Sequence, residues 1–116
     1  MNDHIPSGQL VLLQDLADNP EAYNQTSIRA TGLLRSYRPE CNEAIIEHEG
    51  SILRLMTDLI IPFPFETNAL IQCIGEVHLE ESNQELVLRP RIVRNVDTLD
   101  MKLYKERIQL SRKLNI

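Results

Sequence analysis

Five short runs in which apolar and polar residues alternate constrain the fold of this chain more than any other feature. A period of two with one apolar side is typical of half-buried β-strands. Turn-forming residues separate the runs, and Glu49–Gly50 between the second and third runs predicts a hairpin. The pattern therefore predicts five short strands, over residues 27–37, 43–49, 51–59, 69–79 and 85–96.

Glycine and proline inside these runs indicate how the strands bend. Gly32 and Gly75 lie within the first and fourth runs, where a glycine often marks a sharp bend or a close backbone approach. Pro90 lies within the fifth run and predicts a bulge or a sheet edge. Five bent strands followed by a helix fit an all-β fold, the five-stranded Greek-key β-barrel known as the OB-fold, with a C-terminal α-helix. A five-stranded α+β sheet or an SH3-like barrel would give a similar pattern.

The chain length of 116 residues allows one domain. We expect residues 1–9 to form a flexible tail, because structure-breaking residues cluster there, and residues 10–116 to form the OB-fold domain. Residues 10–16 are apolar enough for a strand that runs into a helical turn. The two prolines of Ile61–Phe65 exclude a regular helix and predict a loop that places two phenylalanines in the core.

A C-terminal helix is predicted over about residues 98–114, with Asp97–Thr98 as its N-cap. A helix on one barrel needs an apolar stripe of only about 100°. This helix carries two apolar clusters on nearly twice that arc, namely Leu99, Leu103, Leu110 and Leu114, and Met101, Tyr104 and Ile108. Either both clusters are buried within one domain, or one packs on the barrel and the other on a partner's helix. The pattern leaves both possibilities open.

The formal net charge of −5 weighs against tight, stand-alone binding of nucleic acid, because neutralisation of phosphates dominates such affinity. Aromatic residues make up only 4% of the chain, so surfaces for base stacking are sparse. We expect at most a weak, auxiliary contact with nucleic acid, through Arg35, Tyr37, Arg54 and Arg89 on the barrel exterior. Residues 98–116 alone are basic, which fits a solvated helix end or a contact with an acidic partner.

The sequence offers no catalytic or metal-binding motif. The cysteines and histidines that could bind zinc, Cys41, Cys73, His48 and His78, do not have the spacing of a zinc knuckle. The dispersed glycines do not form a phosphate-binding loop. We therefore expect no enzymatic activity, no cofactor and no metal. Two cysteines favour a reducing compartment, and without an apolar run of about 18 residues we expect no membrane-spanning segment.

Three segments together resemble the smallest (TEN) subunit of the CST telomere-capping complex. Ser27–Leu34 is similar to the first barrel strand of that family and Ile74–Val77 to its fourth strand. Arg91–Tyr104 resembles the fifth strand and the start of the terminal helix in plant- and animal-type members. The resemblance runs in register over about residues 10–114. The loop Ile61–Phe65 departs from the family pattern, as do the acidic N-terminal segment and an aliphatic Leu114.

The resemblance implies a non-catalytic subunit in the nucleus, at telomeric chromosome ends. Such a subunit pairs with the STN subunit, and the heterodimer joins the large CTC subunit on single-stranded telomeric DNA. It also supports C-strand fill-in by DNA polymerase α–primase. The DNA would be contacted mainly through the complex. The alternative is an RPA small subunit, a scaffold of the same architecture in general single-stranded DNA binding and replication.

The resemblance also implies roles for individual residues. A first-strand arginine of the partner contact maps to Arg29, and the terminal helix packs against a helix of the STN subunit. Gly32 and Gly75 are implied to be structural, and a side chain at Gly75 is expected to break the barrel. The helix residues implied to bind the partner are Met101, Leu103, Tyr104, Arg107, Ile108 and Leu114.

Overall fold

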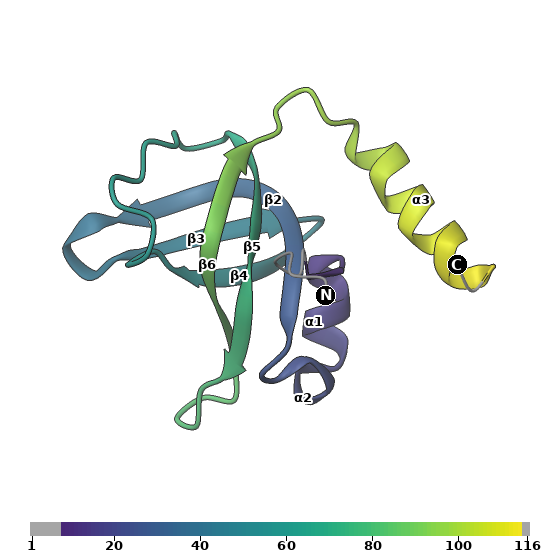
Figure 1. Ribbon diagram of the computed structural model, residues 1–116, viewed down its shortest axis with the longest axis horizontal. Helices are drawn as coiled ribbons and strands as arrows, with labels where there is room; N and C mark the ends of the chain where they lie inside the picture. The colour runs from purple at the N-terminus through teal and green to yellow at the C-terminus, as the bar shows by residue number, and fades with distance from the viewer. Residues whose placement is uncertain (1–7, 115–116) are drawn as a thin grey trace, which may run out of the picture.

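A curved sheet closed into a barrel, with one helix beside it, forms the protein (Figure 1). The computed structural model describes residues 8–114. The strands are β1 (Gln9–Leu10), β2 (Ser27–Arg38), β3 (Glu43–His48), β4 (Ser51–Met56), β5 (Leu70–Leu79) and β6 (Leu86–Asn95). The helices are α1 (Leu13–Asp18), α2 (Pro20–Tyr23) and α3 (Met101–Lys113), with a single 3₁₀ turn, η1 (Pro39–Cys41).

The five predicted strands are confirmed as β2 to β6, and their pairing closes the barrel. The strand order is β1-β2-β3-β4-β6-β5, and β2 also pairs with β5. β2 achieves this by pairing with β5 over residues 27–33 and with β3 over residues 33–38. A short parallel contact between β4 and β6 completes the ring. This is the five-stranded OB-fold barrel, to which β1 adds two residues in parallel along β2.

The N-terminal part of the described chain packs against the barrel as a short strand followed by a helix. Of the predicted tail, residues 1–7 lie outside the described residues, and Gln9 already belongs to β1. The region predicted as a strand running into a turn divides into β1 and the six-residue α1. Leu13 and Leu16 of α1 are buried in the hydrophobic core, so this helix forms part of the barrel's packing.

The proline-rich loop contributes aromatic side chains to the core, as predicted. Phe63 is buried, and its ring centroid lies 4.5 Å from that of Tyr37. Phe65 is partly buried and lies 5.1 Å from Phe63 in an edge-on arrangement. The strand before this loop is shorter than predicted. It ends at Met56 because the backbone turns at once, with the N–H of Ile60 bonded to the carbonyl of Thr57.

A bulge where β5 faces β6 confirms the prediction drawn from Pro90. The register shifts between Ile74 and Gly75, and Gly75 lies opposite Pro90. The bulge reverses the in–out alternation in the second half of β6, because one extra residue exchanges the two faces of a strand. Unbroken alternation along the fifth predicted strand places Ile92 on the same inward face as Leu86 and Leu88, and the bulge makes that expectation wrong. Ile92 is exposed, and Val93 packs against the core instead.

Replacing Gly75 by alanine should strongly destabilise the fold. A Cβ atom there would lie 2.3 Å from the carbonyl oxygen of Arg89 and 2.7 Å from the Cα of Pro90, and neither backbone atom can rotate away. We expect the free energy of unfolding, measured by chemical denaturation, to fall by about 3 kcal/mol or more. Gly50→Asn is the matched control, expected to cost less than about 1 kcal/mol, because nothing lies within 4 Å of that position. An unchanged unfolding midpoint for Gly75→Ala would contradict the close approach.

The two cysteines should differ sharply in reactivity. Cys73 is fully buried on β5, and desolvation raises the pKa of its thiol to about 12. The reactive thiolate is therefore scarce at neutral pH. Cys41 is exposed in η1 and serves as an internal reference. Alkylation followed by mass spectrometry should show fast labelling of Cys41 and labelling of Cys73 only when the barrel opens. The labelling of Cys73 should be faster in Gly75→Ala than in the wild type. Equal labelling rates in the native protein would contradict the closed barrel.

Candidate partner-binding surface

The linker Val96–Asp100 determines where α3 begins. The carboxylate of Asp97 accepts a hydrogen bond from the backbone N–H of Leu70 at 2.7 Å, which ties the linker to β5. The carboxylate of Asp100 accepts from the backbone N–H groups of Lys102 and Leu103 at 3.0 and 3.2 Å. The N-cap is therefore Asp100, and the prediction of Asp97–Thr98 is wrong. Asp97 bonds to the sheet instead, so the helix starts at Met101.

The helix α3 lies beside the barrel (Figure 1). Ile108 is the one buried side chain among its described residues, with 4% of its surface exposed. Polar contacts supply much of the remaining attachment. They are a hydrogen bond between Tyr104 and Thr31 and two ion pairs, Lys105–Glu49 and Arg112–Asp15.

The ion pair between Arg112 and Asp15 joins α3 to the start of α1. Two guanidinium nitrogens of Arg112 donate to the two carboxylate oxygens of Asp15 at 2.9 and 2.7 Å. The backbone N–H of Leu12 donates to the same carboxylate at 2.8 Å. Partial burial raises the pKa of Asp15, but the hydrogen bonds from Arg112 and Leu12 and the charge of Arg112 outweigh it. The pKa of Asp15 is therefore held below its ordinary value.

A row of polar side chains leads from β6 to the first turn of α3. Thr31, Gln72 and Arg94 are aligned in register across β2, β5 and β6. Arg94 donates two hydrogen bonds to the amide oxygen of Gln72, and the Gln72 amide nitrogen donates to the Thr31 hydroxyl at 3.2 Å. The Thr31 hydroxyl lies 3.2 Å from that of Tyr104. Because Thr31 and Gln72 are buried, this row fixes the position of the Tyr104 ring.

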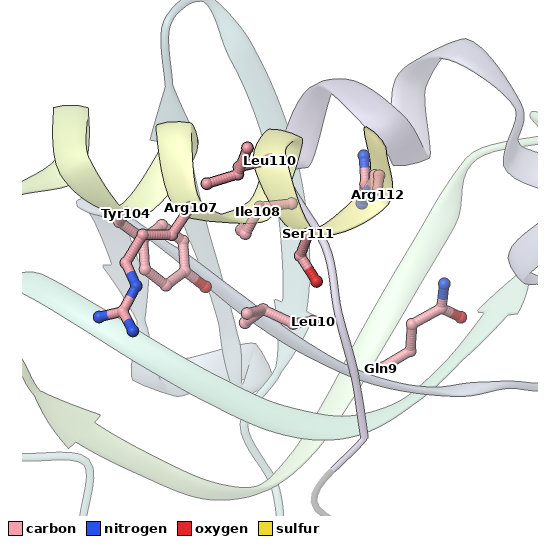
Figure 2. Close-up of a pocket in the computed structure, with 8 residues that line it drawn as sticks. All are labelled: Gln9, Leu10, Tyr104, Arg107, Ile108, Leu110, Ser111 and Arg112. Carbon is pink, nitrogen blue, oxygen red and sulfur yellow. The ribbon is translucent and has the colours of Figure 1, made fainter. Parts of the chain in front are cut away.

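Two grooves flank α3. The larger has a volume of about 700 Å³ and lies between the helix and β1. Figure 2 shows Tyr104 and Ile108 pointing from α3 into this groove, toward Leu10. The smaller groove has a volume of about 490 Å³ and is lined by the linker, Leu103, Tyr104 and Arg107. Arg107 borders both grooves.

The outward side of α3 carries a line of side chains at a spacing typical of helix–helix contacts. Leu103, Leu110 and Leu114 each expose more than half of their surface, and Arg107 is exposed among them. These positions follow one another at intervals of four, three and four residues, the spacing of a seam between two helices. We call Leu103, Arg107, Leu110 and Leu114 the outer seam. A large apolar side chain at three of its four positions makes this a candidate docking surface.

The two apolar clusters of the helix differ in what they face. Ile108 is buried, Tyr104 bonds to the barrel and Met101 is half-buried. The cluster of Met101, Tyr104 and Ile108 therefore faces the chain's own barrel, because Lys105 and Arg112 pair with acidic residues of the barrel and of α1 and fix the rotation of the helix. Sequence reasoning missed Leu110 as an outward residue, although the four-three-four spacing marks it.

Arg29 of β2 lies near this surface. It is half-buried, and it is aligned with Leu10, which lines the larger groove. The backbone carbonyl of Arg29 accepts from the N–H of Val11 at 3.2 Å, so β1 follows the strand at this point.

The four side chains considered for nucleic-acid contact are engaged within the chain. Arg35 forms an ion pair with Glu47 at 2.7 Å, and Arg89 forms one with Asp58 at 2.5 Å. Arg54 pairs with Glu43 and Glu80. The ring of Tyr37 packs against Phe63. A phosphate that approached these guanidinium groups would have to compete with a carboxylate at each one.

Metal ligands do not gather in the described part of the chain. No group of three or more His, Cys, Asp or Glu side chains in residues 8–114 is placed to hold a metal ion. Within the same residues, none of the helices has the length and apolar character needed to cross a membrane.

The sequence matches a known family over nearly its whole length. Residues 4–115 match the model of a family described as telomere-capping CST complex subunits. The chain is 38% identical over 109 residues to the CST complex subunit TEN1 of Arabidopsis thaliana, which covers 93% of this chain and 86% of the relative.

Solved structures show the same fold at low sequence identity. A chain of the Stn1–Ten1 complex of S. pombe aligns with a TM-score of 0.73 and 12% identity, over 95% of this chain and 96% of that one. Replication protein A of U. maydis, solved with single-stranded DNA, aligns with a TM-score of 0.67 and 13% identity, over 95% and 94% of the two chains. These likenesses confirm the predicted OB-fold.

Breaking the Arg112–Asp15 pair should loosen α3 without unfolding the barrel. In Arg112→Gln, we expect amide hydrogen exchange in α3 to be about fivefold faster, as for the loss of a well-formed surface ion pair. Lys113→Gln is the matched control, since Lys113 has no ion pair among the described residues. Equal exchange in the two variants would contradict the role of the pair.

The contribution of this pair should also depend on pH, with a definite sign. Because the folded pKa of Asp15 is lowered, the pair stabilises the folded state at pH values above the ordinary aspartate pKa. That stability is lost as the pH falls through the lowered folded value. The difference in unfolding free energy between the wild type and Arg112→Gln should therefore be constant near neutral pH and vanish in acid. A difference that grew in acid would contradict this assignment.

Proposed function

The chain belongs to the family of telomere-capping CST complex subunits, and on that premise we propose that it pairs with an STN-type subunit through α3. The observation that carries the proposal is the outer seam, where three leucines are exposed on a helix that is attached to its own barrel largely by polar groups. A helix of the partner that packs on this seam would bury the leucines. The grooves on both sides would receive its flanking side chains.

The residues that face the barrel have a second role in this proposal. Tyr104 and Ile108 hold α3 in place, and Met101 begins it, so they present the outer seam to the partner. Arg107 lies within the seam and borders both grooves, where its guanidinium can meet polar groups of the partner. Arg29 contributes from the neighbouring edge of β2.

We further propose a non-catalytic role at telomeric chromosome ends in the nucleus. In this role the heterodimer joins the large CTC subunit, binds single-stranded telomeric DNA and supports C-strand fill-in by polymerase α–primase. Other subunits would supply most of the DNA contact. This is supported by the carboxylates that already pair with Arg35, Arg54 and Arg89. The CST family match favours this role over that of an RPA small subunit.

Charges placed on the outer seam should weaken the heterodimer and leave the barrel folded. We expect Leu103→Glu and Leu110→Glu each to reduce affinity for an STN subunit by about tenfold or more, because a carboxylate would be buried against apolar side chains. Both positions are exposed in the isolated chain, so the melting temperature should change little. Isothermal titration calorimetry measures the affinity.

Gln109→Glu provides the control for charge alone, because Gln109 is exposed on the same helix but outside the outer seam. Its affinity for the STN subunit should equal that of the wild type. If Leu103→Glu and Leu110→Glu bind as the wild type does, the seam is not the interface. The wild-type chain alone should bind telomeric single strands far more weakly than the heterodimer, and tight binding by the chain alone would contradict the proposal that other subunits supply most of the DNA contact.

A further inference from the structure

A third groove lies on the outside of the β3–β4 hairpin and shares no lining residue with the two grooves beside α3. It has a volume of about 300 Å³ and lies between the hairpin, α1 and the turn that joins β5 to β6. Ile45 and Ile52 of the hairpin line it, and 64% of the surface of Ile52 is exposed to solvent. We call it the hairpin groove. Its apolar floor is unusual for a strand surface that faces water.

The charged groups around the hairpin groove are predominantly acidic. Arg54 is the one cationic side chain that lines it, and its guanidinium is paired with both Glu43 and Glu80. Glu85 also lines the groove and has no ion pair among the described residues. Two carboxylates therefore already pair with the one guanidinium, and Glu85 adds a further negative charge to the groove. The neighbouring Glu81 likewise has no ion pair in the described part of the chain and adds to the negative potential.

The location matters because OB-folds that bind oligonucleotides use this part of the barrel. The second and third barrel strands and the adjoining loops form that face, and here they are β3, β4 and the β5–β6 turn. Residues 43–56 contain no Phe, Tyr or Trp, so this face lacks the large aromatic rings on which single-strand binders stack bases. Its carboxylates would repel phosphates. This face therefore has neither the positive charge nor the stacking rings that binding of a single-stranded nucleic acid requires.

We propose that the hairpin groove binds a cationic, aliphatic segment of a protein partner. Lysine or arginine side chains of that segment pair with the carboxylates of Glu81 and Glu85, because Glu80 is already paired with Arg54. Its leucine- or isoleucine-type side chains pack on Ile45 and Ile52. Charge complementarity guides the encounter, and the apolar floor supplies the buried centre that a specific interface needs. This surface is separate from the outer seam, so both can be occupied at once.

A labelled amphipathic peptide of leucine and lysine, about four helical turns long, is the probe for the full-length chain. Fluorescence anisotropy should show binding that weakens as salt is added, because the lysines pair with exposed carboxylates. Ile52→Lys and Glu85→Lys should each weaken binding by about tenfold. Both side chains are exposed, so the melting temperatures should stay close to that of the wild type.

Matched variants distinguish peptide binding in the hairpin groove from attraction by the overall negative charge of the chain. Leu59→Lys and Glu66→Lys make the same chemical changes at exposed positions in the β4–β5 loop, outside the groove, and should bind the peptide as the wild type does. Equal losses in all four variants, or equal binding of a leucine–glutamate peptide, would overturn the proposal. A single-stranded oligothymidylate that bound the wild type and displaced the peptide would overturn it in favour of a nucleic-acid site.

Discussion

The closure of the barrel depends on the ability of one strand to bond to three others. β2 is twelve residues long, and it pairs with β5 along its first half, with β3 along its second half and with β1 beside its start. At Gly32 it passes close to β3, because a Cβ atom there would lie 3.0 Å from the backbone carbonyl oxygen of Glu47. This strand determines where the core residues lie, where α1 packs and where the row of polar groups under α3 is placed.

The two candidate surfaces differ in the physical basis of their binding. The outer seam is aliphatic and lies on a basic helix that its own barrel leaves largely uncovered. The hairpin groove combines two isoleucines with an acidic rim. Of the three barrel-exterior arginines considered for phosphate contact, Arg54 lines the hairpin groove, and Arg35 and Arg89 line neither surface. Arg35, Arg54 and Arg89 instead stabilise the barrel by pairing with carboxylates far away in the sequence.

The sequence alone predicts the strands well. Each strand has one face in the core, so apolar and polar residues alternate along it. The bulge could also be predicted, since Pro90 cannot donate a ladder hydrogen bond. The exposure of Ile92 could not, because the bulge changes which face the following residues occupy. The orientation of α3 was likewise hidden, because it depends on Asp15 and Glu49, which lie 97 and 56 residues before their partners. Helical periodicity identifies two apolar clusters but gives no sign of which one faces the barrel.

The pairing of Arg112 with Asp15 also has a consequence for the order of folding. Loop closure over 97 residues is entropically unfavourable until the intervening chain is already compact. We therefore expect the barrel to form before α3 reaches its final orientation, and the helix to dock last and to detach first. A partner that requires the docked helix would then select chains whose barrel has closed. Assembly would in this way act as a check on the folded state of each newly made subunit.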